Sequence, residues 1–250
     1  MFKDIFLFEI SFRLKRISTY VYFGIWFLMG FIYMSSDSVL QLGIGTKVAK
    51  NSPYGISQLL ALLTAFGTPI ISAVTGTAIY RDFEERMHLI LFSTPISKFG
   101  YLGGRLFGSL FSTFIIFIGI PIGMFLGTLM PWADSTKLAP FSLMSYLQPF
   151  LLIVIPNILF LGTLFFLVGT LTRNILAVYL QGVVVFAIYL ISLNLIGDVN
   201  NQFTPALLDP FGLITIDSIT KYWTVADRNN LLLPISGVML YNRLLWSLLA

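Results

Sequence analysis

Five long stretches of this 250-residue chain contain no Asp, Glu, Lys, Arg or His, and they restrict its possible folds more than any other feature. The stretches cover residues 18–34, 56–80, 106–130, 146–170 and 175–196. A helix needs about 20 mostly apolar residues to cross the hydrocarbon layer of a membrane. Charged residues make up only 10% of the chain, against roughly 25% in soluble proteins, so they could not cover a water-facing surface. We therefore expect an all-α polytopic membrane protein.

A sixth apolar stretch begins near residues 231–238 or at Leu244, and it is still open at Ala250. We therefore expect about six transmembrane helices, with the last incomplete at residue 250, and a natural chain that continues further. Every polar stretch is shorter than the roughly 50 residues that a small soluble domain needs. Residues 1–250 thus form a single predicted transmembrane domain.

The loop charges predict an orientation, because cytoplasmic loops of membrane proteins are rich in Lys and Arg. With the N-terminus inside, the inner segments carry far more cations than the two short outer loops. The inner cations are Lys3, Arg13, Lys15, Arg16, Arg81, Arg86, Lys98, Arg105 and Arg173. The outer loops carry only Lys47, Lys50 and Lys137. This asymmetry predicts a cytoplasmic N-terminus, and it places residues 197–240 outside. The cations after Ile196, which are Lys221, Arg228 and Arg243, weaken the asymmetry without reversing it.

Residues 1–17 form a separate element before the first predicted span. Apolar residues such as Phe6, Phe8 and Ile10 alternate with polar ones, which is the period of a β-strand. A single strand at a membrane would leave its backbone groups unpaired. We therefore predict an interfacial helix whose aromatic side chains enter the membrane while Lys15 and Arg16 face lipid phosphates.

Glycines recur at intervals of four in and before the third predicted span, a spacing that lets another helix approach closely. Packing within the chain and contact with a second subunit both explain this pattern, and we favour packing within the chain. The glycines are Gly100, Gly104 and Gly108, followed by Gly119, Gly123 and Gly127.

The five stretches also lack the ionisable residues that usually mark proton or ion pathways. This argues against a proton- or sodium-coupled carrier, so a transporter of this kind would take its energy from another subunit. The amides Gln148, Asn157 and Asn194 are better explained by hydrogen bonds between helices. Prolines inside the stretches predict packing bends rather than gating hinges. They are Pro69, Pro121, Pro149 and Pro156.

The sequence offers no constellation for catalysis. His88 is the only histidine, there is no cysteine, and no Gly-x-Ser-x-Gly motif occurs. The run Gly43-Ile44-Gly45-Thr46-Lys47 lacks the spacing of a phosphate-binding loop. We therefore expect a protein that is not an enzyme, with no ATPase site, metal or cofactor of its own.

Residues 81–98, between the second and third predicted spans, are the most distinctive polar segment on the predicted cytoplasmic side. The segment begins Arg81-Asp82-Phe83-Glu84-Glu85-Arg86. Apolar residues then follow Phe83 at helical spacing, at Met87, Ile90 and Leu91, and the pattern stops at Pro95. We predict a short amphipathic helix whose apolar side faces either lipid or a partner protein.

This order of elements resembles the permease subunit of type-2 ABC exporters. The segment from Arg81 to the phrase Ser93-Thr94-Pro95-Ile96-Ser97-Lys98 looks like that family's coupling segment, with Glu84, Glu85 and Arg86 matching its charged part. Tyr101-Leu102-Gly103-Gly104-Arg105 matches the usual entry to the third span. The glycine that often follows the acidic cluster is replaced by Met87 or His88. Two later runs are similar to long bacterial permeases: Leu208-Asp209-Pro210-Phe211-Gly212-Leu213 and Lys221-Tyr222-Trp223-Thr224.

The resemblance implies a permease of the exporter type in the bacterial inner membrane, driven by a separate ATPase subunit that binds the ATP. Residues 1–17 would be an elbow helix, and residues 197–240 an outer loop that folds back partly into the membrane. The implied partners are the ATP-binding-cassette subunit, a second permease copy or half, and membrane lipid, but no nucleic acid. The implied docking residues for the ATPase are Arg81, Asp82, Phe83, Glu84, Glu85 and Arg86.

An alternative reading remains open, in which the chain is a non-transport membrane scaffold or assembly protein. Its cytoplasmic helix would then bind a partner without an ATP cycle. Co-purification distinguishes the two readings, because a permease should bring down a subunit with nucleotide-binding motifs.

Overall fold

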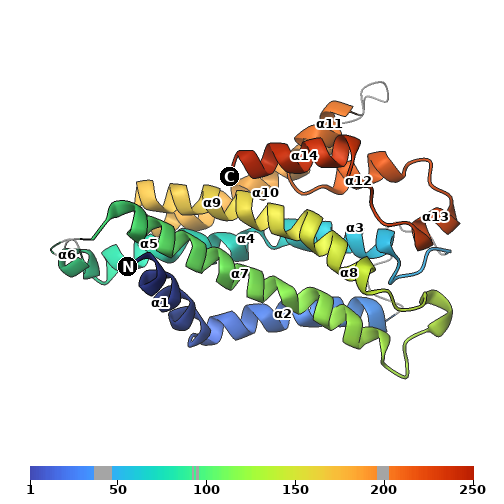
Figure 1. The fold of residues 1–250 in the computed structure, drawn as a ribbon, viewed down its shortest axis with the longest axis horizontal. Coiled ribbons are helices and arrows are strands. Elements are labelled where there is room, and N and C mark those ends of the chain that lie inside the picture. The colour runs from blue at the N-terminus through green and yellow to red at the C-terminus, as the bar shows by residue number, and fades with distance from the viewer. Residues whose placement is uncertain (37–46, 92, 94–95, 196–202) are drawn as a thin grey trace.

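The computed structural model describes residues 1–36, 47–91, 93, 96–195 and 203–250, and within them the chain is helical with no β-strand (Figure 1). Most helices lie along the long axis of the molecule. We call its two ends the α6 end, where α1 and α5 also lie, and the α13 end. The elements are α1 (Phe2–Leu14), α2 (Ile17–Ser35), α3 (Pro53–Phe66), α4 (Thr68–Ile71), η1 (Ser72–Gly76), α5 (Thr77–Glu84), α6 (Met87–Leu91), α7 (Lys98–Thr128), η2 (Ser135–Lys137), α8 (Leu143–Pro149), η3 (Phe150–Val154), α9 (Ile155–Thr172), α10 (Ile175–Leu195), α11 (Phe203–Leu208), α12 (Leu213–Thr220), α13 (Val225–Asn230) and α14 (Gly237–Leu248).

Among the described residues, three helices are long and apolar enough to cross a membrane: α2, α7 and the continuous helix Leu143–Thr172. A fourth crossing results if α3 and the helix Thr68–Glu84 are taken as one broken span, since they meet at an angle of 53°. The expected all-α membrane architecture is therefore present. The prediction of about six transmembrane helices is wrong, because the structure supports three, or four with the bent pair.

The difference between the predicted and observed numbers of crossings lies at the C-terminal end of the chain. α10 has 21 residues, but the side chains at its start and in its last third lie partly outside the described residues, so it is not among these crossings. The expected sixth span is α14, whose 12 residues rise about 18 Å, against a hydrocarbon layer of about 30 Å. Glycines with positive φ, Gly212 at 90° and Gly237 at 57°, precede α12 and start α14. Turns therefore divide residues 203–250 into four short helices.

The second predicted span is broken at Gly67, which lies between α3 and α4. Pro69 lies in the first turn of α4, where its missing N–H costs least, and the π-helical turn η1 follows directly. A Cβ on Gly67 would lie 2.5 Å from Phe117 Cζ, so any larger residue at this corner would have to displace the ring of Phe117. The π-helical turn η3 begins directly after Pro149. The predicted packing bends at these two prolines thus coincide with irregular helical turns.

The helices α2 and α7 run parallel and pack closely along most of the length of α2 (Figure 1). The later glycine triplet makes this contact possible. A Cβ on Gly123 would lie only 2.0 Å from the carbonyl oxygen of Phe27, and one on Gly127 only 2.6 Å from that of Phe31. These glycines therefore bring the two helix backbones together within one chain.

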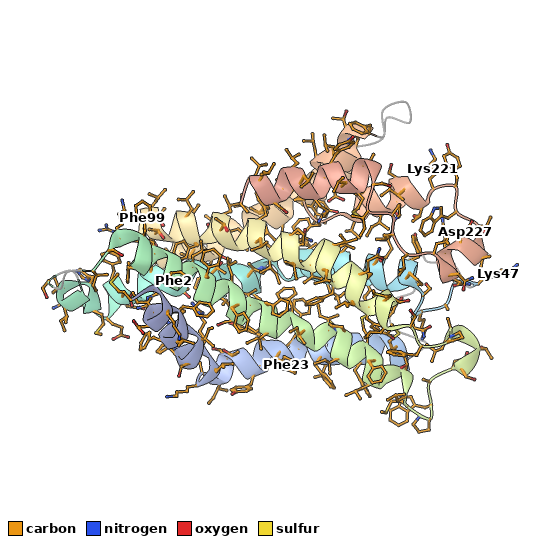
Figure 2. All side chains as sticks on the ribbon, viewed as in Figure 1. Phe2, Phe23, Lys47, Phe99, Lys221 and Asp227 are labelled. Carbon is orange, nitrogen blue, oxygen red and sulfur yellow. The ribbon has the colours of Figure 1, made fainter. Side chains whose placement is uncertain are left out.

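The two ends of the molecule carry different segments, as the labelled side chains in Figure 2 show. Phe2 and Phe99 lie toward the α6 end, and Lys47 lies at the α13 end. There the backbone N–H of Ala49 donates to Oδ1 of Asn229, 2.8 Å away. The loop after α2 therefore meets α13 at the end opposite α6. The glycine-rich residues Gly43-Ile44-Gly45-Thr46, which lack the spacing of a phosphate-binding loop, lie outside the described residues.

Candidate functional site

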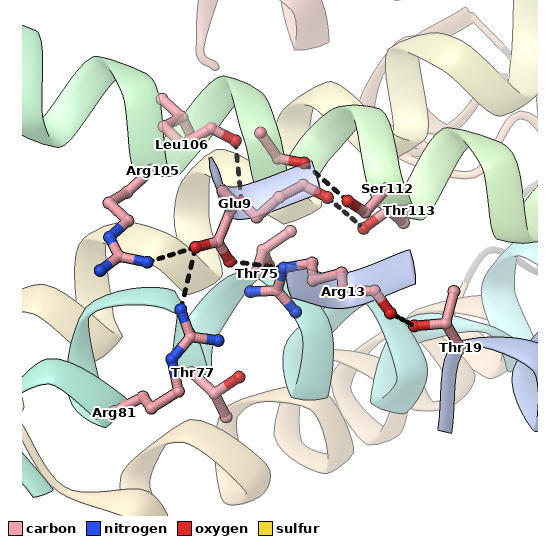
Figure 3. Close-up of polar contacts among 12 residues, drawn as sticks. Glu9, Arg13, Thr19, Thr75, Thr77, Arg81, Arg105, Leu106, Ser112 and Thr113 are labelled. Carbon is pink, nitrogen blue, oxygen red and sulfur yellow. Dashed lines mark hydrogen bonds and ion pairs between the residues drawn. The ribbon is translucent and has the colours of Figure 1, made fainter. Parts of the chain in front are cut away.

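A buried group of ion pairs lies at the α6 end, where α1, α5 and α7 meet (Figure 3). Its members come from segments far apart in the sequence. We call this group the ionic cluster, and it consists of Glu9, Arg13, Arg81, Asp82, Tyr101 and Arg105.

The carboxylate of Glu9 is the centre of the ionic cluster, and this residue has no exposed surface. Its Oε1 accepts from Nε of Arg13, one helical turn further along α1, at 2.6 Å. Its Oε2 accepts from Nη2 of Arg81 at 2.9 Å and also from Nη1 of Arg105. One carboxylate thus receives guanidinium groups from α1, α5 and α7 together.

Arg105 also reaches the second carboxylate of the cluster. Its Nη2 lies 2.6 Å from both carboxylate oxygens of Asp82. The hydroxyl of Tyr101, one turn earlier on α7, donates to Oδ2 of the same carboxylate at 2.5 Å. Arg105, which belongs to α7, therefore links the acid of α1 to the acid of α5.

The cluster holds three guanidinium groups and two carboxylates, so its formal charge is one positive unit. Burial raises the pKa of Glu9, but Arg13, Arg81 and Arg105 outweigh this effect and hold it below its ordinary value. Glu9 is therefore ionised at neutral pH. Removing one partner of a buried ion pair costs about 3–5 kcal/mol, because the other charge is left unpaired. The three helices are consequently held in one arrangement.

Aromatic rings of α1 cover the guanidinium groups. Cζ of Arg81 lies 3.9 Å from the centre of the Phe12 ring, and Cζ of Arg105 lies 5.4 Å from that of Phe8. Such cation–π contacts are stronger where water is excluded. They attach α1 to the other two helices by a second kind of interaction.

The earlier glycine triplet lets α1 lie close enough to α7 for these contacts. A Cβ on Gly108 would lie 2.7 Å from Cβ of Glu9, and one on Gly104 would lie 2.8 Å from Cγ2 of Ile5. A Cβ on Gly100 would lie 2.9 Å from Cε of Met1, the residue before α1. Both predicted triplets thus face elements of the same chain: α1 for the earlier one and α2 for the later one.

The six residues expected to dock an ATPase have two different environments. Arg81 and Asp82 point into the ionic cluster, and Asp82 is only 4% exposed. Phe83 is half-buried and packs against Ile79 and Tyr101. Glu84, Glu85 and Arg86 are exposed. Only this second half can therefore meet a partner directly, while the first half connects it to the interior.

The exposed part is a sharp turn between two helices rather than one amphipathic helix. α5 continues the bent span as far as Glu84, and Arg86 has φ 52°, in the left-handed region that ends a helix. α6 follows, and the ring of His88 stacks on that of Phe83 with centroids 4.7 Å apart. We call residues Glu84–His88 the tip. The expected end of this segment at Thr94 and Pro95 lies outside the described residues.

The residues that sequence reasoning missed as a site are Glu9, Arg13, Tyr101 and Arg105. The expected interfacial element is indeed a helix, α1, but the expectation did not include its buried charged pair. Glu9 and Arg13 point into the protein, whereas Leu7 and Phe8 are exposed. The spacing of Glu9 and Arg13 by four residues was the available signal, since such pairs lie on one helix face.

A second buried polar group connects the C-terminal helices to α9. Nη1 of Arg243, on α14, donates to Oδ1 of Asn157 at 2.9 Å, and Arg243 is only 6% exposed. Nδ2 of Asn157 donates in turn to the carbonyl of Phe211. Gln148 reaches the carbonyl of Leu233 at 2.7 Å. These two amides therefore bond to the C-terminal segment, while the side chain of Asn194 is outside the described residues.

No group of three or more His, Cys, Asp or Glu side chains in the described part of the chain could hold a metal ion. No protein-family model, curated protein or solved structure matches this chain. Any function must therefore be argued from the ionic cluster and the tip themselves.

Proposed function

We propose that this chain is the membrane-spanning permease subunit of an ATP-binding-cassette transporter of the exporter type. A separate ATPase subunit docks on the tip and binds the ATP, and a second permease copy or half completes the pathway. In this proposal the α6 end is cytoplasmic and the membrane is the bacterial inner membrane. The cation-rich segments near this end support that orientation.

The observation that carries the proposal is the position of the tip relative to the ionic cluster. The exposed residue Glu84 lies two residues after the buried Asp82 in the same helix. Asp82 is bound to Arg105 of α7, and Arg105 is bound to Glu9 of α1. A force applied to the tip therefore acts on α1, α5 and α7 as one unit instead of bending a loop.

This connection suggests how an ATP cycle could move the helices. Closure of two ATPase subunits would displace the tips of two permease chains. Because the buried ion pairs resist separation, the displacement would pass to the bent span and to α7 as a rigid-body motion. The helices would then open their pathway alternately to the two sides of the membrane, with no chemistry in the chain itself.

Charge reversal at the tip tests the docking step. We expect E84K and E85K each to lower the ATPase stimulation by the permease at least several-fold, while membrane insertion stays unchanged. D4K is the matched control, because Asp4 is an exposed acid at the same end, on α1, with a side chain 78% exposed. The measurement is ATP turnover of the cassette subunit that co-purifies with the tagged chain in mild detergent.

Two results would count against the proposal. Unchanged stimulation in both tip variants would remove the docking assignment. Co-purification of a partner that has no nucleotide-binding cassette would favour the alternative, a membrane scaffold that uses the same exposed tip without an ATP cycle.

A further inference from the structure

A cavity of about 360 Å³ lies between α5, α7 and α9 at the α6 end, directly beside the ionic cluster. Its lining is mainly apolar and includes Ile79, Phe83 and Leu102. The ring of Tyr101 also lines it, and the hydroxyl of this residue is engaged by Asp82. The volume is within the range of about 300–1,000 Å³ that is usual for small-ligand sites. The cavity could therefore enclose part of an amphiphilic molecule.

Two cations, Lys98 and Arg173, line the same cavity, and no acidic residue is among its lining side chains in the described part of the chain. Both are exposed, and within the described residues neither forms an ion pair. Cζ of Arg173 lies 4.2 Å from the centre of the Phe83 ring, so its guanidinium lies over the apolar wall. The cavity thus combines an apolar wall with an unneutralised pair of cations.

The backbone at Arg173 favours a role for its side chain. Arg173 ends α9 with φ 50°, and its N–H donates to the carbonyl of Gly169. Glycine is the usual residue in this left-handed position, since a side chain there is mildly unfavourable. An arginine occupies it here and directs its guanidinium to the cavity wall.

The cavity lies at the ends of two candidate membrane-spanning helices, the level expected for the membrane surface. α7 starts at Lys98 and α9 ends at Thr172, and both belong to helices that are long and apolar enough to cross the bilayer. The ends of these helices mark the headgroup region. Basic pockets between membrane helices at this level suit anionic lipid headgroups, and arginine matches the geometry of a phosphate group.

We propose that this cavity binds one anionic phospholipid of the leaflet at the α6 end. Lys98 and Arg173 contact the phosphate, and the glycerol and first acyl carbons lie against Phe83 and Leu102. This site requires only the membrane and the chain itself, so it holds whether or not an ATPase docks at the tip. Because Phe83 also stacks on His88 of α6, the lipid would lie directly beside the tip.

Native mass spectrometry of the full chain in detergent tests the proposal. We expect one phosphatidylglycerol to stay bound per chain at concentrations where phosphatidylcholine with the same acyl chains does not. K98Q/R173N should weaken phosphatidylglycerol binding about 30-fold, since each cation near an anionic membrane surface contributes a factor of about five. Asparagine is chosen at residue 173 because it tolerates the left-handed backbone.

Two further variants distinguish lipid binding in this cavity from general electrostatic attraction and from the effects of misfolding. K15Q/R16Q removes two exposed cations from the same end of the molecule, outside the cavity, and should leave binding within about threefold of wild type. K98R/R173K keeps both charges and should also bind. Equal binding of the two lipids, or an equal loss in K15Q/R16Q, would overturn the proposal. So would displacement of phosphatidylglycerol by equimolar glycerol phosphate, because the site would then take a soluble phosphate.

Discussion

Arg105 shows how one residue can determine the arrangement of several helices. It lies one position after Gly104, near the start of α7, and it binds the acids of both α1 and α5. A guanidinium group is suited to this role because its planar set of five donors serves two carboxylates at once. The charged residues near the membrane surface are thus used for internal packing as well as for orientation.

We expect R105M to lower the free energy of unfolding by about 3–5 kcal/mol, because the buried Asp82 then loses the guanidinium group that pairs with it. D82N/R105M should be less destabilised than the sum of the two single variants, since neither unpaired charge remains. Denaturation in detergent measures both. R16M is the control at an exposed arginine, and additive effects of D82N and R105M would show that the pair is not coupled.

Membrane spans without charged residues do not imply that the protein interior beside them lacks charged side chains. The predicted fourth span contains no ionisable residue, yet its Asn157 accepts a hydrogen bond from the buried Arg243. Arg243 comes from α14, 86 residues away in the sequence. Composition along one helix cannot reveal a charge that another helix places against it.

At the scale of elements, α7 organises the N-terminal half of the molecule. Its earlier glycines face α1 and its later glycines face α2. Helix association in membranes depends on close packing and not on the hydrophobic effect, because lipid tails are as apolar as the side chains. The turn between α1 and α2 is therefore held by contacts of both helices with one rigid partner.

We expect G123A to destabilise the fold by about 1–3 kcal/mol, because its Cβ would overlap the backbone of α2 at Phe27. Gly24 is the matched control, since it is also inside a membrane helix but a Cβ there meets nothing within 4 Å. G24A should be neutral or up to about 1 kcal/mol more stable. Thermal unfolding in one detergent compares the two variants. Equal stability of G123A and G24A would contradict the close approach of α2 and α7.

At the scale of the whole molecule, the structure separates two ends of different character. The α6 end carries α1, the ionic cluster and the tip. At the α13 end, the loop after α2 contacts both the segment after α7 and α13, through Lys50 N–H to the Lys137 carbonyl and Ala49 N–H to Asn229. Such contacts bring the predicted outer loops together on one face.

This arrangement predicts the topology, and the lack of cysteine in the chain makes the test direct. We expect K137C and K221C to react with a membrane-impermeant thiol reagent in intact cells. E85C should react only after permeabilisation, because the tip lies at the opposite end. Reaction of E85C and K137C from the same side would contradict both the arrangement and the orientation.

The sequence by itself determined that the chain is a helical membrane protein, because long apolar stretches with so few charges have no other stable fold. It also located the helical N-terminal element, the glycines that pack helices and the bend at Pro69, since each depends on residues close together in the chain. Only the tertiary structure decided the number of crossings, because turns divide residues 203–250 into helices that are too short to cross a membrane. It also decided the ionic cluster. Glu9, Asp82 and Arg105 lie far apart in the sequence, and their charges are buried together because α1, α5 and α7 meet in space, where glycines of α7 allow the close approach of α1.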